Sequence, residues 1–415
     1  MNNTDTHPQA TIRQCAILAG GLGTRLGALT ATTPKPILPV GGRPFLGWLI
    51  REVSRFGIEE ILLLTGHLSD RVRETVTAIA DSLPRRLSIR FSEEPVRAGT
   101  GGALFHAAPM LDERFLLLNG DSLLDINLAA MLAAASQDDP DVIGRIAIRP
   151  VVDTSRYGFV ARDGDRITDF LPRLPEGTPP GPGWINGGVY LFNREIAAHA
   201  NAICSLEADI LPNLARAGRL RASTADGYFI DIGIPADFER AQTELPAALR
   251  RPALLLDRDG TINIDHGWVG ERERFAFLPG ATTAIANATK AGWHVFIVTN
   301  QSGIARGRYT EADFAALHAW IANQVHQAGG TIDDTRYCPY HPDAKLDAYR
   351  RVSDWRKPAP GMVLDLVRAW ELDPARCIMV GDQQTDVQAA EAAGIKGFLF
   401  PGDDLAAFVE PFLNA

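Results

Sequence analysis

The sequence predicts an α/β protein made of two units, each a sheet covered by helices. Two observations carry this prediction. Short apolar runs alternate with amphipathic helical stretches along the chain, which is typical of sheets whose strands are joined by helices. The pattern also starts twice, because a buried strand that runs into a turn occurs at 13–20 and again at 252–260. We therefore expect domains at 1–245 and 252–415, joined by the short segment 244–252.

The expected strands are short apolar runs bounded by polar or turn residues. In the first unit they lie at 61–65, 115–118, 144–148 and 188–192, after the opening strand. In the second unit they lie at 295–299 and 377–380. Because helical segments separate them, we expect largely parallel sheets that are covered on both faces.

The composition of the 415-residue chain is that of a globular protein, with 46% hydrophobic and 22% charged residues. A net charge of −9 argues against a general binder of nucleic acid. No apolar run reaches the ~20 residues that cross a bilayer, and the first residues lack the layout of a signal peptide. Cysteines are scattered without a Cys-x-x-Cys pair, at Cys15, Cys204, Cys338 and Cys377. We expect a cytoplasmic protein with no nucleic-acid or membrane partner.

A glycine-rich turn follows the first strand, and its residues suit phosphate binding. The turn contains Gly20, Gly21, Gly23 and Thr24. Glycines let backbone N–H groups approach a phosphate closely, and the helix expected next would add its positive end. Such turns also occur for packing alone, so the glycines leave both interpretations open. Arg25 and Lys35 favour an anion site, because Lys35 stands between two prolines that fix its backbone.

The stretch 19–26 followed by Pro34-Lys35-Pro36 resembles the signature of the sugar-phosphate nucleotidyltransferases. The resemblance covers about 13–243 and continues in order through Gly99-Thr-Gly-Gly-Ala103, Leu118-Asn-Gly-Asp121, Tyr157-Gly158, Asn186-Gly-Gly-Val-Tyr190 and Asp231-Ile-Gly233. Within that family, the pattern is most similar to guanylyltransferases of heptose 1-phosphate. The resemblance implies a Rossmann-like, mixed-sheet domain of the GT-A type. In such a domain a sugar 1-phosphate oxygen attacks the α-phosphorus of GTP, and pyrophosphate leaves.

The resemblance also implies a role for each matching residue. Gly20, Gly21, Gly23 and Thr24 would cradle the triphosphate, Arg25 would hold the departing pyrophosphate, and Lys35 would neutralise charge at the α-phosphate. Asp121 and Asp231 would hold Mg²⁺. Gly99, Thr100, Gly101 and Gly102 would face the base and ribose, and Asn119, Gly158, Asn186 and Gly187 would lie near the sugar. Where relatives often carry Glu-Lys-Pro, this chain has Phe170-Leu-Pro-Arg173, so Arg173 is the candidate for the sugar phosphate.

Two carboxylates, Asp257 and Asp259, end the first apolar strand of the second unit. Acids at this spacing can share one metal ion, one through its side chain and the other through its backbone carbonyl. One carboxylate is then free to attack phosphorus, and the other can transfer a proton. Three further segments strengthen this interpretation in chain order: Val298-Thr-Asn-Gln-Ser-Gly303, Arg356-Lys-Pro358 and Val380-Gly-Asp382.

Together these segments resemble the haloacid-dehalogenase superfamily across about 252–400. The resemblance implies a Rossmannoid domain with a small or absent cap and a Mg²⁺-dependent phosphatase activity. Asp257 would form an aspartyl-phosphate, and Asp259 would be the general acid and base. Thr299 and Asn300 would bind phosphoryl oxygens, Lys357 would offset charge, and Asp382 would complete the metal site with Asp257 and Asp259. Gly267-Trp-Val269 and the segment 356–362 resemble phosphatases of heptose 1,7-bisphosphate, which makes Arg306 and Arg356 candidates for substrate contact.

Two departures from that subgroup stand out. Its members commonly carry a zinc loop with Cys-x-His followed by Cys-x-Cys, whereas this chain has Cys338 and His341 followed by 353–355 without cysteine. Zinc wants four good nitrogen or sulfur ligands, so we expect no zinc and a loop held by packing through Tyr340 and Trp355. The second departure is Gln383, where relatives often place a lysine.

The two halves predict consecutive reactions. A phosphatase would remove the 7-phosphate of heptose 1,7-bisphosphate, and a guanylyltransferase would join heptose 1-phosphate to GMP from GTP, with Mg²⁺ in both domains. Three alternatives remain: the same reactions on another sugar or with ATP or UTP, a transferase fused to a catalytically silent phosphatase-like domain, and a non-enzymatic sugar-nucleotide sensor. A homo-oligomer is compatible with the sequence.

Overall fold

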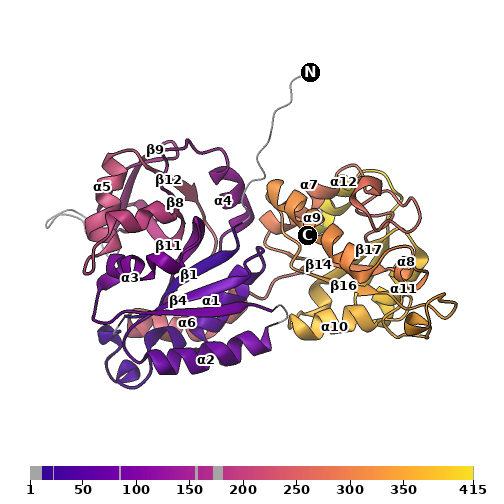
Figure 1. Ribbon diagram of the computed structural model, residues 1–415, viewed down its shortest axis with the longest axis horizontal. Helices are drawn as coiled ribbons and strands as arrows, with labels where there is room; N and C mark the ends of the chain where they lie inside the picture. The colour runs from indigo at the N-terminus through magenta and orange to yellow at the C-terminus, as the bar shows by residue number, and fades with distance from the viewer. Residues whose placement is uncertain (1–11, 22, 84–85, 155–157, 172–180, 415) are drawn as a thin grey trace. The chain divides into compact units, whose positions relative to one another are not determined.

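The chain divides into two units between Ala248 and Leu249 in the computed structural model (Figure 1). The structure describes residues 12–414 apart from 22, 84–85, 155–157 and 172–180. None of the helices in this described part is long and apolar enough to span a lipid bilayer.

The N-terminal unit contains a mixed sheet whose described strands follow the order β5-β4-β1-β6-β11-β8-β12-β10-β9. The strands are β1 (Gln14–Leu18), β4 (Glu60–Thr65), β5 (Ser88–Glu93), β6 (Arg114–Asn119), β8 (Gly144–Val151), β9 (Phe159–Asp163), β10 (Arg166–Leu171), β11 (Gly183–Asn193) and β12 (Leu220–Thr224). β1 lies between β4 and β6, and all three are parallel. The ends of β1 and β6 are therefore neighbours, with Leu18 opposite Asn119.

The expectation of largely parallel strands is wrong for part of this sheet. β11 runs antiparallel to both β6 and β8, and β9 and β10 form an antiparallel hairpin. An antiparallel pair can be joined by a tight turn and needs no crossover helix, so the alternation of strands and helices stops in this part of the chain. The predicted strands at 61–65, 115–118, 144–148 and 188–192 all lie in this sheet.

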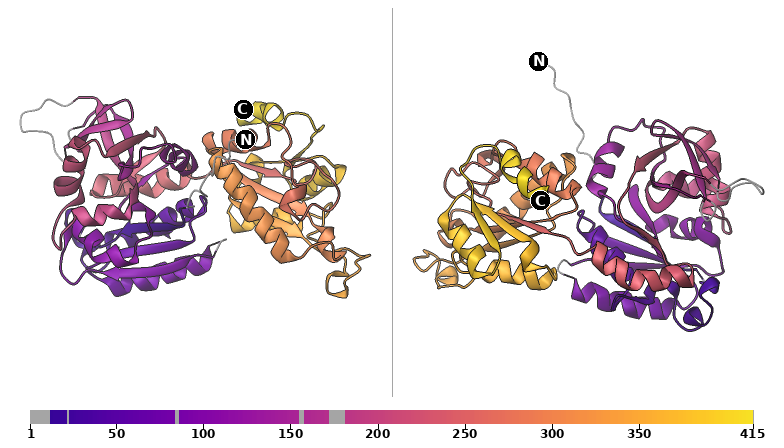
Figure 2. Two further views of the ribbon diagram at one scale, coloured as in Figure 1. Left: turned by 45° about the horizontal axis from the view of Figure 1, so that its top comes forward. Right: turned by 180° about the vertical axis from the view of Figure 1, so that it is seen from behind.

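Helices cover both faces of the sheet (Figures 1 and 2). They are α1 (Phe45–Ser54), α2 (Ser69–Ser82), α3 (Gly99–Ala107), α4 (Leu128–Ala135), α5 (Leu211–Arg216) and α6 (Pro235–Ala248). α3 and α5 pack on one face through buried residues such as Leu104 and Leu214, which share a core with Leu62 and Leu117 of the sheet. This core fixes the ends of β1, β4 and β6 relative to one another.

Two short antiparallel pairs complete the N-terminal unit: β2 (Pro39–Val40) with β3 (Arg43–Pro44), and β7 (Ser122–Leu124) with β13 (Phe229–Asp231). The second pair matters for the site, because Asp231 pairs with Ser122, the residue after Asp121. Two acids far apart in the sequence thus meet beside the end of β6.

The C-terminal unit is built on a parallel sheet whose described strands follow the order β16-β15-β14-β17-β18. The strands are β14 (Ala253–Leu256), β15 (His294–Asn300), β16 (Asp334–Cys338), β17 (Cys377–Gly381) and β18 (Lys396–Leu399). Side chains alternate between the two faces of a strand. Leu254 and Leu256 of β14 accordingly join one core, and Ala253 and Leu255 join another. Both faces of β14 are buried, as the apolar run predicts.

Helices flank this sheet on both sides (Figure 2). They are α7 (Ala281–Lys290), α8 (Ser302–Ala305), α9 (Glu311–Gln327), α10 (Gly361–Ala369), α11 (Gln384–Ala392) and α12 (Leu405–Leu413). α7, α9 and α12 contribute to the core of Leu254, whereas α10 and α11 contribute to the core of Leu255. The carboxyl ends of β14, β15 and β17 open at one edge, where ligands bind in open α/β sheets.

Candidate active sites

The glycine-rich turn of the N-terminal unit leaves β1 at the edge where β4 also ends. A Cβ on Gly20 would lie 3.3 Å from the backbone nitrogen of Gly66, so the two turns pass close together. Gly23 has φ 62°, the left-handed conformation that glycine adopts without strain. The helix expected after this turn is a 3₁₀ segment, Thr24–Thr30, which is interrupted at Gly27. This short segment supplies less positive potential to a phosphate than the end of a longer helix would. The charges of Arg25 and Lys35 are therefore the main attraction for an anion in this turn.

Lys35, Asp121 and Asp231 meet at one point. Nζ of Lys35 contacts Oδ2 of Asp121, and the lysine side chain is only 13% exposed. A Cβ on Gly233 would lie 2.9 Å from Oδ1 of Asp231 and 3.6 Å from Nζ of Lys35. Burial and the charge of Asp121 raise the pKa of Asp231, and the charge of Lys35 opposes this. Two adjacent carboxylates offer hard oxygen ligands that fit Mg²⁺.

Glu94 is a charged residue at this edge that the sequence analysis did not single out. Its backbone nitrogen donates to the carbonyl of Thr65, which places it directly after β5. Cβ atoms on Gly20 and Gly66 would lie 3.0 Å and 2.4 Å from its Oε1, so the carboxylate occupies the space above both glycines. Its Oε2 accepts a hydrogen bond from the backbone nitrogen of Ala98 (3.1 Å). The only signal in the sequence is an acid shortly before the Gly-Thr-Gly-Gly motif.

The Gly-Thr-Gly-Gly motif starts α3 and packs against the segment 202–207. The backbone nitrogens of Gly101 and Gly102 both donate to the carbonyl of Cys204. The hydroxyl of Thr100 donates to Oε2 of Glu207 (2.6 Å). A Cβ on Gly99 or Gly101 would meet Cys204, and a Cβ on Gly102 would meet Ala202, so all three glycines pack closely against this segment. Contact of the four residues with a nucleotide stays a prediction. Gly99 is exposed at the start of α3.

The residues predicted near the sugar lie around β11. The amide of Asn186 donates to the hydroxyl of the fully buried Tyr190 (2.6 Å), and its Oδ1 accepts from the backbone nitrogen of Gly188 (3.0 Å). Asn119 ends β6, and a Cβ on Gly188 would lie 3.1 Å from its Nδ2. Gly187 packs against Leu124, and Gly158 lies just before β9. Arg173 and Tyr157 lie outside the described residues.

In the C-terminal unit, Asp257 follows the central strand β14 and pairs with Lys357. Nζ of Lys357 lies 2.8 Å from Oδ1 of Asp257 and 2.6 Å from Oδ1 of Asp386, and it donates to the carbonyl of Val298 (2.8 Å). Burial raises the pKa of Asp257 to about 7, against the charge of Lys357. Asp386 was not predicted. Its signal is an acid one helical turn after Asp382, at the start of α11.

The same carboxylates form a candidate metal site. Asp257, Asp382 and Asp386 each offer an oxygen within 4.8 Å of the others. Oδ1 of Asp382 is buried and has no hydrogen-bond partner among the described residues, as expected for an atom that awaits a cation. A Cβ on Gly260 would lie 2.4 Å from Oδ2 of Asp382, so a glycine is needed there. The donor set fits Mg²⁺.

Asp259 is held by three side chains. The guanidinium of Arg258 donates to both of its oxygens (2.8 and 2.9 Å from Nη2). The amides of Asn263 and Gln301 donate at 3.0 and 2.9 Å. Asp257, Asp259, Lys357 and Asp382 all line one cavity of about 260 Å³. The predicted nucleophile, acid, lysine and metal ligand thus share one pocket.

The predicted phosphate and substrate residues have mixed surroundings. Thr299 is buried beside the same cavity and accepts a hydrogen bond from Gln301 (2.8 Å). Asn300 also lines the cavity, but both of its side-chain polar atoms bond the backbone of Lys357, each at 3.1 Å. Nε of Arg306 and Nη1 of Arg356 are buried without hydrogen-bond partners in the described chain. Burial is the main cause that lowers the pKa of Arg356, and the charge of Arg306 adds to it.

Comparison with known proteins gives the family of each unit. The nucleotidyl transferase family matches residues 15–247, more than half of the chain. The chain belongs to the nucleotidyl transferase family. The HAD-hydrolase-like family matches residues 354–403. D-glycero-beta-D-manno-heptose-1,7-bisphosphate 7-phosphatase of Rhodopseudomonas palustris is 50% identical over 167 residues, which are 40% of this chain and 93% of that protein.

The enzyme of the same name from Escherichia coli K12 is 45% identical over 144 residues, 35% of this chain and 75% of that protein. The C-terminal unit therefore belongs to the family of these phosphatases. Among solved structures, HddC from Yersinia pseudotuberculosis in complex with GMP-PN is 29% identical and covers 56% of this chain and 100% of that one, with a TM-score of 0.48. The chain is a nucleotidyltransferase fused to a haloacid-dehalogenase-like phosphatase.

The loop 338–355 of the phosphatase unit is packed, as expected. Tyr340 and Trp355 pack against the core that contains the buried Cys338. The guanidinium of Arg351 stacks on the ring of Tyr340 at 3.6 Å. Nδ1 of His341 accepts from the backbone nitrogen of Asp343 (3.0 Å). Cys338 and His341 supply at most two of the four ligands that zinc wants, so the absence of zinc stays a prediction.

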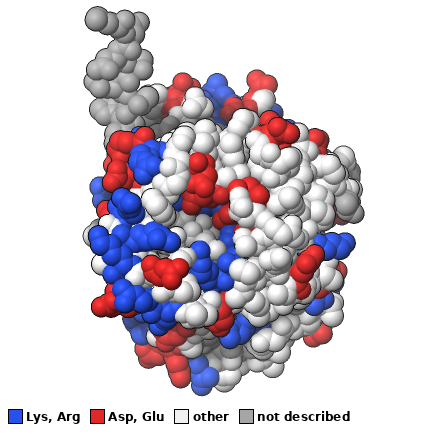
Figure 3. Space-filling view, turned by 90° about the vertical axis from the view of Figure 1, so that its right-hand side faces the viewer, with Lys and Arg blue, Asp and Glu red and all other residues white. Residues whose placement is uncertain are grey.

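Gln383 and Trp268 also line the phosphatase pocket. Gln383 donates to Oδ2 of Asp382 (2.6 Å), so this departure from relatives lies directly on a predicted metal ligand. The guanidinium groups of Arg306 and Arg308 lie 5.8 and 4.8 Å from the ring of the partly exposed Trp268. Figure 3 shows basic side chains gathered on one face of the unit, next to acidic ones.

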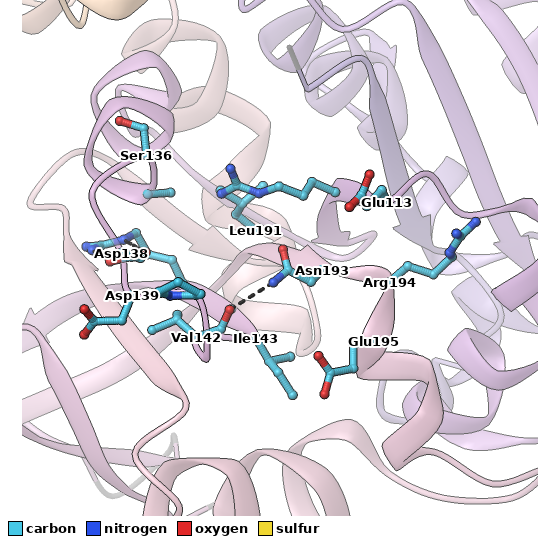
Figure 4. A pocket seen from close by; sticks show the side chains of 15 residues that line it. Glu113, Ser136, Asp138, Asp139, Val142, Ile143, Leu191, Asn193, Arg194 and Glu195 are labelled. Carbon is cyan, nitrogen blue, oxygen red and sulfur yellow. Dashed lines mark hydrogen bonds and ion pairs between the residues drawn. The ribbon is translucent and has the colours of Figure 1, made fainter. Parts of the chain in front are cut away.

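A second cavity, of about 490 Å³, lies in the transferase unit where β6 and β8 begin (Figure 4). Among the residues that line it, Arg145 donates to Asp138, and Asn193 donates to the carbonyl of Val142 (2.9 Å). Catalytic groups of open sheets gather at the opposite, carboxyl ends of the strands. None of the predicted site residues lines this cavity.

Proposed function

We propose that the chain catalyses two consecutive steps of heptose nucleotide synthesis. The phosphatase unit removes the 7-phosphate of D-glycero-D-manno-heptose 1,7-bisphosphate. The transferase unit joins the resulting heptose 1-phosphate to GMP from GTP, which yields GDP-heptose and pyrophosphate. The observation that carries this proposal is the 50% identity to a 7-phosphatase of that bisphosphate, fused to a nucleotidyltransferase. Removal of the 7-phosphate leaves a sugar 1-phosphate, the substrate class of sugar-phosphate nucleotidyltransferases.

In the transferase unit, most of the work is positioning and charge stabilisation. Gly20, Gly21, Gly23 and Thr24 cradle the triphosphate, and Arg25 holds the departing pyrophosphate. Lys35 stands beside the α-phosphate, where it neutralises charge as the sugar phosphate attacks. Asp121 and Asp231 would hold Mg²⁺, which supplies positive charge to the phosphates when bound. The contact between Lys35 and Asp121, a proposed metal ligand, supports this role of the lysine.

Glu94 supports guanine as the base. Its carboxylate stands over Gly20 and Gly66 at the edge of the cradle, and a carboxylate only accepts hydrogen bonds. The Watson–Crick edge of guanine presents two donors, N1–H and the amino group. The same edge of adenine presents one donor beside an acceptor. A carboxylate in this place thus pairs better with GTP than with ATP, and the motif pattern favours GTP as well.

In the phosphatase unit, Asp257 attacks the 7-phosphate and forms an aspartyl-phosphate. Asp259 gives a proton to the departing sugar oxygen and later takes one from the water that hydrolyses the intermediate. Lys357 and Thr299 stabilise the charge on the transferring phosphoryl group. Asp257 and Asp382, with the backbone of Asp259, would hold Mg²⁺, which adds positive charge at the phosphoryl oxygens when bound.

Arg306 and Arg356 support a substrate with a second phosphate. Each has a buried nitrogen that finds no partner among the described residues, and the charge of Arg306 helps to lower the pKa of Arg356. An anion between them would satisfy both nitrogens and remove the repulsion. We assign these arginines to the 1-phosphate of the bisphosphate. Arg173 is proposed for the sugar phosphate in the transferase unit.

The test separates the two activities in one chain. We expect Asp257→Asn to abolish phosphate release from heptose 1,7-bisphosphate and to leave pyrophosphate release from GTP and heptose 1-phosphate intact. Lys35→Ala should do the reverse. Both anomers of each heptose phosphate are assayed. Nucleotidyl transfer does not break the bond between C1 of the sugar and its phosphate oxygen, so the two units must accept the same anomer. Phosphate release that survives in Asp257→Asn contradicts the nucleophile. A wild-type chain that makes GDP-heptose without releasing phosphate indicates a silent phosphatase unit.

A further inference from the structure

We propose that Arg258 is a positioning residue that holds the carboxylate of Asp259 for proton transfer. Gln301, which is itself fixed by Tyr309, holds the carboxylate oxygen of Asp259 that faces the cavity. The inference rests on the proposed role of Asp259 in the phosphatase reaction. It deepens that function by assigning work to three residues that do not contact phosphate in the proposed mechanism.

Arg258 carries a charge that is completely buried. Its side chain is 0% exposed, and its ion-pair partner is Asp259. Nη2 also donates to the carbonyl of Val269 (2.5 Å), and the guanidinium carbon lies 5.7 Å from the ring of Phe314. Removing a guanidinium from water is costly, so its burial needs a compensating interaction. Here the compensation is a bidentate contact with the residue that must transfer the proton.

The carboxylate of Asp259 has donors on every side. Oδ1 accepts from Arg258 and from Asn263, whereas Oδ2 accepts from Arg258 and from Gln301. A carboxylate offers about four acceptor positions, so all of them are used. One contact has to open when a proton moves onto or off Asp259.

The contact that opens is the one from Gln301. Gln301 lines the cavity together with Asp259, whereas Arg258 and Asn263 do not. The carbonyl oxygen of Gln301 accepts a hydrogen bond from the hydroxyl of Tyr309 (2.5 Å). This bond fixes the amide so that its nitrogen faces Asp259. Arg258 and Asn263 thus anchor the rear of the carboxylate, while Gln301 holds the place where the leaving oxygen and then the water arrive.

The test uses two phosphate esters that differ in their need for a proton. A departing sugar oxygen needs a general acid, whereas p-nitrophenolate leaves readily without one. We expect Arg258→Met to lower kcat/KM for heptose 1,7-bisphosphate by ~10²-fold, the lower end of a general-acid contribution. The kcat/KM of Arg258→Met for p-nitrophenyl phosphate should fall by less than about 5-fold, because this loss reflects only small structural changes around the pocket. Arg258→Lys should restore part of the activity, because it returns the charge without the bidentate geometry.

Asp259→Asn in the full-length protein is the reference for this pattern, and Tyr309→Phe is the second variant. Tyr309→Phe keeps the ring, removes the bond to Gln301, and should reproduce the selective loss at a few-fold size. If circular dichroism shows that Arg258→Met does not fold, Tyr309→Phe replaces it in the test. Equal losses on both esters would assign Arg258 a structural role and overturn the proposal. If Arg258→Met loses activity only on the heptose ester but Asp259→Asn does not, the proposed role of Asp259 is wrong. If the wild-type chain is inactive on both esters, the proposed phosphatase function is wrong.

Discussion

Each candidate active site contains a lysine that contacts carboxylates. Lys35 contacts Asp121, and Lys357 lies within 2.8 Å of both Asp257 and Asp386. Burial alone would lower the pKa of Lys357, but the two carboxylates outweigh it and raise the pKa. Lys357 therefore stays charged at neutral pH. The positive charge of such a lysine offsets the repulsion between neighbouring carboxylates and the repulsion between these carboxylates and a bound phosphate.

Glu94 provides a test of base selection at the level of one residue. Replacing it with glutamine turns one acceptor into a donor while keeping the shape. We expect Glu94→Gln to lower kcat/KM for GTP roughly 10-fold to 100-fold, because one donor of the guanine edge loses its partner. Activity with ATP should stay the same or rise. The measurement is pyrophosphate release with each triphosphate and heptose 1-phosphate.

Glu93→Gln is the matched control, since Glu93 is the exposed neighbour at the end of β5. This control should behave like the wild type. If GTP and ATP respond equally to Glu94→Gln, the carboxylate does not read the base, and the choice of guanine loses its structural support.

At the same scale, the sequence predicts the reacting groups better than the groups that hold them. Asp257, Asp382 and Lys357 belong to short sequence motifs, the two acids at strand ends and the lysine in the loop before α10, and the structure brings them together. The position of Glu94 depends on which strands become neighbours, because its carboxylate stands over Gly20 and Gly66, and local spacing does not encode this. Asp386 and Arg258 lie close to the predicted acids in the sequence, but the spacing does not show which groups they hold. Thr100 shows the reverse case. Its motif predicts a ligand, but its hydroxyl bonds Glu207, which is distant in the sequence.

Secondary-structure elements place these residues because parallel strands end together. β14 pairs with β15 and β17, so Asp257, Thr299 and Asp382 emerge at one edge of the sheet. The sequence predicts this geometry well, because each strand is a compact apolar run. It predicts the transferase sheet less well. The hairpin of β9 and β10 and the short pair of β7 and β13 have no apolar periodicity that distinguishes parallel from antiparallel pairing.

The edge strand β16 offers a test of stability at the level of elements. Arg336 on β16 donates to Asp365 of α10 (2.7 Å), and Arg368 donates to the same acid. Burial would raise the pKa of Asp365, but these hydrogen bonds outweigh it and lower the pKa. A carboxyl with a lowered folded pKa stabilises the protein above its unfolded value of ~3.9, and this stability is lost as the pH falls through the folded pKa.

We therefore expect the free energy of unfolding of the phosphatase unit to fall below about pH 5, and to fall less steeply in Asp365→Asn. At pH 7 the substitution should cost about 1 kcal/mol. Urea unfolding across pH 3–7, in the range where acid carboxyls titrate, measures both effects. Asp347→Asn is the control, because Asp347 is 89% exposed in its pair with Arg350. Identical slopes for Asp365→Asn and the control would refute the role of this contact.

At the scale of the whole molecule, each unit has its own sheet, its own buried core and its own site. The phosphatase of Rhodopseudomonas palustris is matched over 93% of its length by 40% of this chain, so a protein of about that size carries the fold by itself. The position of the boundary then decides which residues each unit needs. Leu245 is fully buried, and a Cβ on Gly41 would lie 2.2 Å from Cγ of Pro246. The last turn of α6 is therefore part of the transferase unit.

We predict that fragments 1–248 and 249–415 fold separately and keep the transferase and phosphatase activities, respectively. A transferase fragment that ends at 243 should lose stability by about 2–5 kcal/mol, because it lacks the buried Leu245 and the contact of Pro246 with Gly41. The phosphatase fragment has to begin before Arg250, since Arg376 donates to the carbonyl of that residue and Arg251 is buried. Thermal unfolding and separate assays for pyrophosphate and phosphate release measure the outcome. If both fragments fold but are active only when mixed, the two sites depend on each other. This result would contradict the independence that we infer from their separate cores.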